Sequence, residues 1–345
     1  MHPLACLLLL AEAAPAASVP APLGLFEAEI AIADREPASR PAAIAAGLAQ
    51  VVFRLVGQEA ALRHPLLRAA LARPEGLLER FAYQEEPGPD GRPAGLALRA
   101  AFRSAELLRL LDDAELPLWL GPRPTVLLLV ERPDAPEEGG RFLAAEDAEA
   151  ASWRRAARAL AFRVELPLLD PVERHELATA PLEARTLAAL GRRYGLGVVL
   201  AGRIVDRGEI GEGEWVFWQP DRGASRALLA PLGEQPARAF EALHGWLAER
   251  YALPPSERVP DRFPLAVAGL RGAADYLTLM AWLRAHGLIE GATPEQAEGD
   301  RLELAVEARA RRFRVVESLL LEPRLARDPR PRPGLPPELQ LLWLP

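Results

Sequence analysis

Four residues near the middle of the chain are of types that perform acid–base chemistry or bind metals. Asp170 and Asp206 each follow an apolar run that predicts a strand, and Glu173 and His175 come shortly after Asp170. Ligand sites of α/β sheets lie at the carboxyl ends of parallel strands, so these side chains could form an acid–base or metal-binding cluster. A simpler interpretation is that Asp170 and Pro171 form a turn, with Glu173 and His175 on a solvated helix start. We keep the four as candidates for catalysis and expect neither a metal nor a cofactor.

Other catalytic patterns are missing from the sequence. The chain contains no lysine, which excludes a Schiff base and a P-loop, and its single cysteine, Cys6, excludes an intramolecular disulfide and a Cys-x-x-Cys redox pair. No serine stands in a Gly-x-Ser-x-Gly motif. Three pairs of adjacent acids could in principle do glycosidase-type work, but neighbouring side chains point apart, so solvation explains them. These pairs are Glu85-Glu86, Asp112-Asp113 and Glu137-Glu138.

Arginine groups near the C-terminus are candidates for binding anions. Because arginine forms forked bonds to phosphate, they could meet anionic lipid headgroups or an acidic partner. The alternative is a solvated helix face followed by a soluble tail. The net charge of −7 argues against a nucleic-acid partner. The first group is Arg309, Arg311, Arg312 and Arg314, and the second, which we consider for peripheral membrane contact, is Arg324, Arg327, Arg330 and Arg332.

Other single residues are expected to serve structure. Gly202 lies inside a predicted strand and is expected to allow a close approach of another group. Three histidines lie on or at the ends of predicted helices, where capping or surface roles are the expectation. The tryptophans at strand and helix spacing are expected in the core. The histidines are His64, His244 and His286.

The elements that must position these residues fall into three blocks. Residues 19–120 predict a small α+β domain: a strand from Phe26, a helix that begins near Pro41 and ends at Gly57, a helical stretch from His64 to Phe81, and a second strand from Leu96 followed by a helix. Residues 121–255 alternate strands and helices, which indicates a mainly parallel, helix-covered sheet. Residues 256–345 predict a small domain of split β-α-β type with a Pro-rich tail. The fold class is therefore α/β, or α+β overall.

The N-terminus reads as a secretory signal. Leu4–Leu10 is a short apolar run followed by small residues, which supply Ala-x-Ala cleavage sites after Ala13 or Ala16. The run is too short to span a bilayer. Its start lacks a positive charge, so an Ala/Leu-rich extension, or a true start other than Met1, is the alternative. We predict a signal peptide over residues 1–18 and a periplasmic or otherwise exported protein.

Several stretches resemble a bacterial family. These are residues 26–35, residues 116–119 running into 123–127, residues 166–170, the strand at 199–204 and the pair Asp275-Tyr276. In these the chain is similar to the domain-of-unknown-function family numbered 2066, departing from it at Gly195-Leu196-Gly197. The resemblance implies an uncharacterised, exported proteobacterial protein and implies no activity. The central block also resembles the small α/β domains that precede the Tol-system β-propeller or build the curli secretion lipoprotein, which bind proteins.

Together these observations predict an exported, non-enzymatic scaffold or accessory factor of the cell envelope that acts through protein–protein binding. Two alternatives stay open. An envelope hydrolase would need Asp170, Glu173, His175 or Asp206 to converge in one open cleft. A small-molecule or lipid binder would need a large apolar pocket between blocks.

Overall fold

The computed structural model describes residues 24–87, 93–134, 141–177 and 181–344. The predicted signal segment and Cys6 lie outside these ranges. The described residues form α-helices and three β-sheets, which confirms the α/β class expected from the sequence. We call the parts built on the three sheets the N-terminal unit (Glu27–Asp113), the central unit (Thr125–Tyr251) and the C-terminal unit (Asp261–Trp343).

The N-terminal unit packs helices on a three-stranded antiparallel sheet of order β1-β3-β2. Its elements are β1 (Glu27–Ile32), α1 (Arg40–Val56), α2 (Pro65–Ala72), β2 (Leu78–Pro87), β3 (Pro93–Phe102) and α3 (Ser104–Asp113). One expectation is wrong here, because the helix predicted from His64 to Phe81 ends at Ala72 and the chain continues as β2. The side chains of β2 are mostly exposed, so this edge strand carries no alternation of buried and exposed residues.

Helix α1 begins and ends as its sequence predicts. Pro41 lies in its first turn, and Ile44, Leu48 and Leu55 on one face are buried. The helix ends at Gly57, whose φ of 79° lies in the left-handed region that favours glycine. A Cβ at Gly57 would lie 2.1 Å from the Cβ of Ala248 in the central unit, so the same glycine also allows the two units to touch.

The central unit is a five-stranded sheet of order β5-β4-β6-β7-β8 with helices on both faces. Its elements are β4 (Thr125–Glu131), α4 (Ala150–Ala159), β5 (Arg163–Glu165), α5 (Pro171–Leu177), α6 (Ala184–Tyr194), β6 (Val199–Asp206), β7 (Gly211–Gln219), β8 (Arg222–Ala230) and α7 (Gln235–Tyr251). Alternate residues of β4 face opposite sides: Val126 and Leu128 pack with α4 and α7, and Leu127 and Leu129 pack with α5 and α6. The strand is thus buried on both faces, as its continuous aliphatic sequence predicts.

The central sheet is mixed, whereas the sequence predicts a mainly parallel one. Strands β5, β4 and β6 are parallel, but β7 and β8 form an antiparallel hairpin alongside β6. The expected strand from Val164 to Asp170 is only the three-residue β5. Gly202 has the expected role, since a Cβ there would lie 2.3 Å from the ring of Trp215.

The C-terminal unit follows the same path as the N-terminal unit and then extends it. Its elements are β9 (Asp261–Ala268), α8 (Ala273–Ala285), β10 (Ile289–Glu298), β11 (Arg301–Ala308), α9 (Arg312–Leu319), β12 (Leu325–Arg327) and β13 (Gln340–Trp343). Strand β11 lies between β9 and β10 and is antiparallel to both, which is the expected split β-α-β arrangement. Strand β13 pairs parallel to β9, so the end of the chain returns to this sheet after the Pro-rich tail.

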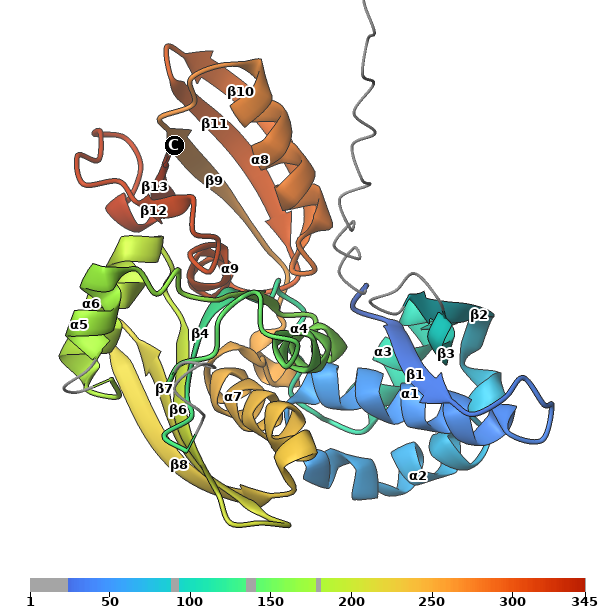
Figure 1. The fold of residues 1–345 in the computed structure, drawn as a ribbon. Helices are drawn as coiled ribbons and strands as arrows, with labels where there is room; N and C mark the ends of the chain where they lie inside the picture. Colours follow the sequence, from blue (N-terminus) through green and yellow to red (C-terminus); the bar gives the residue numbers. More distant parts are fainter. Residues whose placement is uncertain (1–23, 88–92, 135–140, 178–180, 345) are drawn as a thin grey trace, which may run out of the picture.

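The units pack tightly against one another. In Figure 1 the C-terminal unit lies above the central unit and the N-terminal unit lies beside it. One hydrophobic cluster runs through both terminal units and includes Leu118 and Leu120, which lie on the connection into β4. Leu118 and Leu253 exchange backbone hydrogen bonds of 2.9 Å, so the connections that enter and leave the central unit lie side by side.

Candidate functional site

Two of the predicted site residues meet at the start of α5. The carboxylate of Asp170 accepts a 2.9 Å hydrogen bond from the backbone N–H of Glu173 and pairs with Arg193. Glu173 is fully buried, and its carboxylate accepts 2.7 Å bonds from the hydroxyl of Tyr194 and from the backbone N–H of Leu169. The expected solvated position of Glu173 is therefore wrong, because the chain folds back to surround this carboxylate with donors.

The charges around Glu173 are already matched within the protein. The backbone N–H of Glu173 and the guanidinium of Arg193 lower the pKa of Asp170. Burial, together with the hydrogen bond to Glu173, raises the pKa of Tyr194 to about 12. Arg193 also lies 3.1 Å from the Glu173 carboxylate, so both acids share one guanidinium. These contacts tie α5 to α6 and hold Asp170 ionised and Tyr194 protonated at neutral pH.

The other two predicted site residues lie apart from this pair. His175 is exposed on α5. Asp206 is exposed at the end of β6, where its carboxylate accepts a 2.7 Å bond from the backbone of Gly208. Neither side chain has a hydrogen bond or ion pair with Asp170 or Glu173. Within the described ranges, no group of three or more His, Cys, Asp or Glu side chains is placed to hold a metal.

Sequence reasoning missed the acid at the carboxyl edge of the sheet. Chain order and sheet order place a switch point between β4 and β6, where α/β folds bind ligands. Glu131 ends β4 there, is fully buried, and forms ion pairs with Arg141 and Arg203, the latter at 2.7 Å. Each of its oxygens faces a guanidinium, which makes it a clamp between strands instead of a free base. The only signal in the sequence is an acid directly after an aliphatic run.

A hollow lies between the N-terminal and central units. We call it the α1–α7 groove, and its volume is about 680 Å³. Small and aliphatic side chains form its walls, with the polar side chains of Gln50, Glu59, Arg226, Arg238 and Glu241 also lining it. The small and apolar lining includes Ile30 of β1, Ala46 and Ala49 of α1, Ala156 and Ala159 of α4, Ala242 and Gly245 of α7, and Leu228 and Leu229 of β8.

One exposed aliphatic side chain, Leu229, lines the groove at its mouth, and two others lie near it at the end of the β7–β8 hairpin. Leu229 is 74% exposed although it lies in a strand, and Ile210 is 50% exposed. Leu232, 39% exposed, lies beside Gly211 at the start of β7, which brings the three side chains to the same end of the β7–β8 hairpin. Within the described residues β8 pairs only with β7, so its other edge is open. An apolar groove next to exposed aliphatic residues and an open strand edge is typical of a surface that binds another polypeptide.

Buried cations hold the closed side of this groove together. We call Arg54, Trp119, Arg123 and His244 the buried joint. Arg54 is fully buried in α1 and donates two bonds, of 2.6 and 3.1 Å, to the carbonyl oxygen of Ala159 at the end of α4. Arg123 donates to the carbonyl of Arg54, and His244 of α7 lies 3.1 Å from the carbonyl of Phe53. Both carbonyls belong to the last turn of α1, so the cation of Arg123 complements the end of α1 and that of Arg54 the end of α4.

The buried joint carries positive charge in an apolar setting. Burial lowers the pKa of Arg54 to about 10, and it lowers the pKa of Arg123 as well, with repulsion from Arg54 adding to the effect. Burial and the neighbouring guanidinium of Arg123 lower the pKa of His244 to about 3, so the imidazole is neutral at ordinary pH. Trp119 stacks on His244 at 5.3 Å between ring centroids and on the guanidinium of Arg123 at 3.9 Å. The contact between α1, α4 and α7 therefore contains fully buried Arg54, Trp119 and His244.

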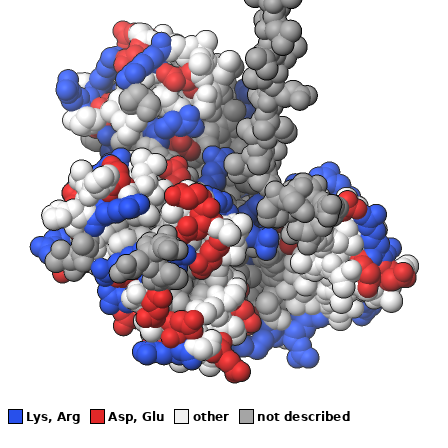
Figure 2. All heavy atoms as spheres, viewed as in Figure 1, with Lys and Arg blue, Asp and Glu red and all other residues white. Residues whose placement is uncertain are grey.

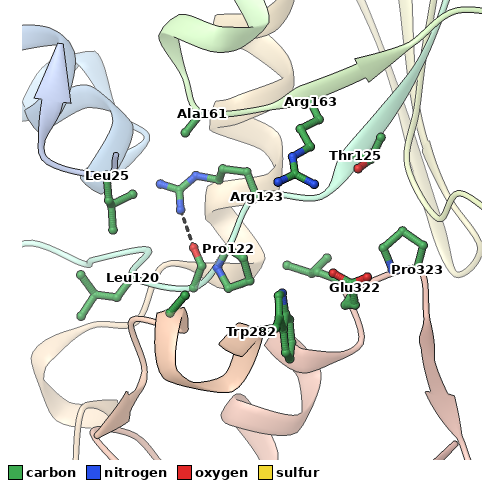
Figure 3. Close-up of a pocket in the computed structure, with 13 residues that line it drawn as sticks. Leu25, Leu120, Pro122, Arg123, Thr125, Ala161, Arg163, Trp282, Glu322 and Pro323 are labelled. Atoms are coloured by element: carbon green, nitrogen blue, oxygen red, sulfur yellow. Dashed lines mark hydrogen bonds between the residues drawn. The ribbon is translucent and has the colours of Figure 1, made fainter. Parts of the chain in front are cut away.

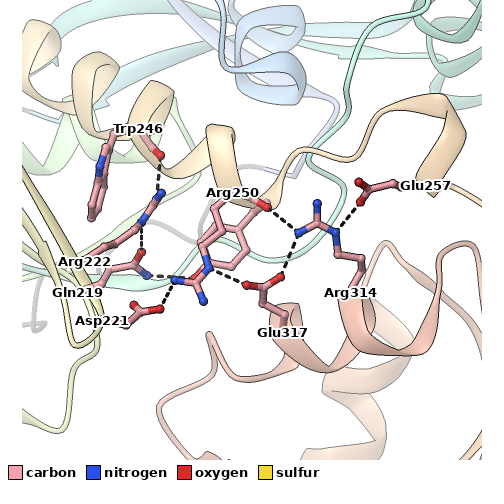
Figure 4. A network of polar contacts seen from close by, with 9 residues as sticks. Gln219, Asp221, Arg222, Trp246, Arg250, Glu257, Arg314 and Glu317 are labelled. Carbon is pink, nitrogen blue, oxygen red and sulfur yellow. Dashed lines mark hydrogen bonds and ion pairs between the residues drawn. The ribbon is translucent and has the colours of Figure 1, made fainter.

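A second, more polar contact connects the central and C-terminal units. We call Asp221, Arg250, Glu257, Arg314 and Glu317 the ionic joint (Figure 4). Arg250 of α7 donates 2.6 Å bonds to Asp221 in the β7–β8 turn and to Glu317 of α9. Arg314 donates to Glu257 at 2.5 Å and to Glu317 at 3.1 Å. Arg250 and Glu317 keep about a quarter of their side-chain surface exposed, at 28% and 26%.

The remaining candidate features are the histidines and the charged side chains on the surface. His64 caps α2 as expected, whereas His244 and His286 are buried and not on the surface. Burial lowers the pKa of His286 to about 3. Acidic and basic side chains are interspersed over the face shown in Figure 2. None of the helices in the described ranges has the length and hydropathy needed to cross a bilayer.

Comparisons with known proteins identify only part of the chain. A family model described as a domain of unknown function (DUF8605) matches residues 21–120. The N-terminal unit is a domain of unknown function. The matched segment contains every element from β1 to α3. It supports the general expectation of such a domain but not the particular 2066 family. No curated protein and no solved structure matches the chain.

Proposed function

We propose that this protein is an exported scaffold or accessory factor of the bacterial cell envelope that acts by binding a partner protein and not by catalysis. The observation that carries the proposal is the α1–α7 groove with the exposed aliphatic residues at its mouth. An apolar segment of a partner would bury its side chains between Ala46 and Ala242 and cover Leu229. Apolar burial contributes about 25 cal/mol per Å², so covering such a surface favours association.

The rigidity of the groove supports the same proposal. Its walls come from α1, α4, α7 and β8, and the buried joint fastens α1 to α4 and α7. A preformed surface loses little conformational freedom when a partner binds, which favours affinity. A scaffold needs units held in fixed relative positions, and both joints supply this.

The proposal that the protein is exported depends on the sequence alone. The apolar run at Leu4–Leu10, the small residues after it and the resemblance to the 2066 family all favour an exported proteobacterial protein. The resemblance of the central unit to domains of the Tol and curli systems favours protein binding. Contact of the C-terminal arginines with a membrane stays a proposal. Arg324 pairs with Glu322 and Arg332 with Glu298, so part of this charge is matched within the chain.

The hydrolase alternative gains no support from the geometry. It requires the four candidate residues to converge in an open cleft, but Glu173 is buried among donors. Asp170 is paired with Arg193, and His175 and Asp206 are exposed and make no hydrogen bond or ion pair with either acid.

Filling the groove tests the proposal. Ala46 is exposed on its wall, so Ala46→Trp should occupy the space without disturbing the core. We expect the tagged wild-type chain, crosslinked in cells, to capture a defined envelope protein, and the variant to lose most of that product. Leu277→Trp is the matched control, because Leu277 is 64% exposed on α8, away from the groove. Equal capture by Ala46→Trp and Leu277→Trp would contradict the proposal, as would a tagged chain retained in the cytoplasm with an unprocessed N-terminus.

A further inference from the structure

A second cavity lies where the segment before β1 and the connection into β4 meet the central and C-terminal units (Figure 3). Its volume is about 320 Å³, at the small end of the range typical of ligand sites. Leu25, just before β1, forms part of one wall, and Trp282 of α8 with Glu322 forms another. The connection into β4 contributes Arg123, and the central unit contributes Arg163. This cavity is separate from the α1–α7 groove, with which it shares no lining residue.

The charges around the cavity are unbalanced toward the positive. The guanidinium of Arg123 is buried and bonds only to carbonyl oxygens, among them those of Trp119 and Gly121, while its Nε has no partner. The side chain of Arg163 has no hydrogen bond or ion pair to any residue in the part of the chain that the structure describes. Glu322 is the one acid of the lining, and its carboxylate already accepts a 2.9 Å bond from Arg324. Because Arg163 is exposed and its guanidinium is unpaired, it is free to bond to an anion that enters the cavity.

The shape of the cavity defines the rest of the ligand. Apart from the charged groups, its walls are apolar, formed by Leu120, Ala161, Leu321 and the indole of Trp282. In Figure 3 the guanidinium of Arg163 extends toward the cavity from the side opposite Trp282. A molecule lying between them would meet a cation at one end and an aromatic surface at the other.

We infer that this cavity binds a small carboxylate with a compact apolar or aromatic body. The carboxylate accepts hydrogen bonds from the guanidinium of Arg163, and the body packs against Trp282 and the aliphatic wall. Because the lining comes from the segment before β1, the connection into β4, the central unit and the C-terminal unit, an occupied cavity also stabilises the relative arrangement of these parts. This site is independent of the partner-binding groove, and either can fail without the other.

Calorimetric titration with benzoate tests the inference on the full exported chain. Benzyl alcohol, which has the same aromatic body without the charge, should bind at least tenfold more weakly than benzoate. Arg163→Gln should weaken benzoate binding by roughly tenfold to a hundredfold, since it removes a charge-assisted hydrogen bond. Arg192→Gln is the matched control, because Arg192 is an exposed arginine of the same unit on α6, and it should leave benzoate binding unchanged.

A second variant tests the cavity through its shape instead of its charge. Ala285→Leu places a larger side chain in the cavity from α8 and should reduce benzoate binding without removing any charge. Several results would overturn the inference. These are equal binding of benzoate and benzyl alcohol, equal affinities of the Arg163→Gln and Arg192→Gln variants, inorganic phosphate binding as tightly as benzoate, and no benzoate binding at about 10 mM.

Discussion

The two contacts that hold the units together differ in how they handle charge. In the buried joint, Arg54 and Arg123 bond to carbonyl oxygens at helix ends, and His244 beside them is neutral. In the ionic joint, Arg250 and Arg314 pair with carboxylates that water still reaches. Salt screens the second kind of contact and hardly reaches the first. The N-terminal and central units, which form the groove, are therefore joined by the contact whose strength depends less on salt concentration.

Removing the cation at the centre of the buried joint should have the largest effect. Arg54→Met leaves the carbonyls of Gly24, Glu27 and Ala159 without their donor in a buried setting. We expect a loss of about 3 kcal/mol in the free energy of unfolding, measured by denaturant titration. Arg68→Met, on an exposed position of α2, should change it by less than about 0.5 kcal/mol. Similar values for the two variants would show that the buried joint contributes little.

Acid should act on the buried histidines and not on the ionic joint. His244 and His286 have pKa values of about 3 in the folded protein, against an ordinary value of 6.5. Between these pH values the unfolded chain binds more protons, so stability is complete above pH 6.5 and falls as the pH drops below it. From pH 7 to pH 5 the loss should be about 2 kcal/mol for each histidine.

Two variants isolate these histidines. His244→Gln and His286→Asn keep a polar group near the bonded atoms and remove the titration. Each should abolish about half of the decline in unfolding free energy between pH 7 and pH 5, as followed by denaturant titration at several pH values. A decline that persists unchanged in both variants would rule out the histidines as its origin.

Salt should produce the smallest effect, and only at the ionic joint. Arg250→Gln removes bonds to Asp221 and Glu317 and should lower the free energy of unfolding by about 1 kcal/mol at low salt. The difference from wild type should shrink toward zero in about 1 M NaCl, because the pairs are partly exposed. Arg238→Gln, which removes half-exposed pairs within α7, should cost less than about 0.5 kcal/mol. A salt-independent deficit of the Arg250 variant would place that contact with the buried joint.

The elements that sequence predicts well are those with a buried face. The aliphatic period of α1 with its stop at Gly57, and the continuous apolar run of β4, both match the structure. The missed strands β2, β8 and β10 are all edges of their sheets. These three strands leave most of their side chains in water and have no hydrophobic period, whereas β1, also an edge, keeps its period because Ala28 and Ile30 pack against the core. The N-terminal and C-terminal units have a similar order of helices and strands, which becomes visible only when these edge strands are counted.

The candidate sites were harder to predict because their partners lie far apart in the chain. Arg54 and Ala159 are separated by 105 residues, and His244 and Phe53 by 191. No local spacing signals such a contact, so His244 reads as a surface histidine. The α1–α7 groove is likewise built from residues of both units, each of which is an ordinary alanine or leucine in its own segment. The acids that follow β5 and end β6 are candidates only because of their residue type. Residue type does not determine whether a carboxylate is already paired with a donor or a cation in the folded protein.

The central claim is that the α1–α7 groove receives a partner, and crosslinking from the groove tests it most directly. A photoreactive amino acid would replace Leu229 at the mouth or Leu277 on α8, both of which are exposed aliphatic positions. After illumination in cells, we predict one dominant product from position 229 and little from position 277. That product should disappear when Ala46→Trp fills the groove. The same products from both positions, or no product from position 229 while the chain is folded and exported, would contradict the account.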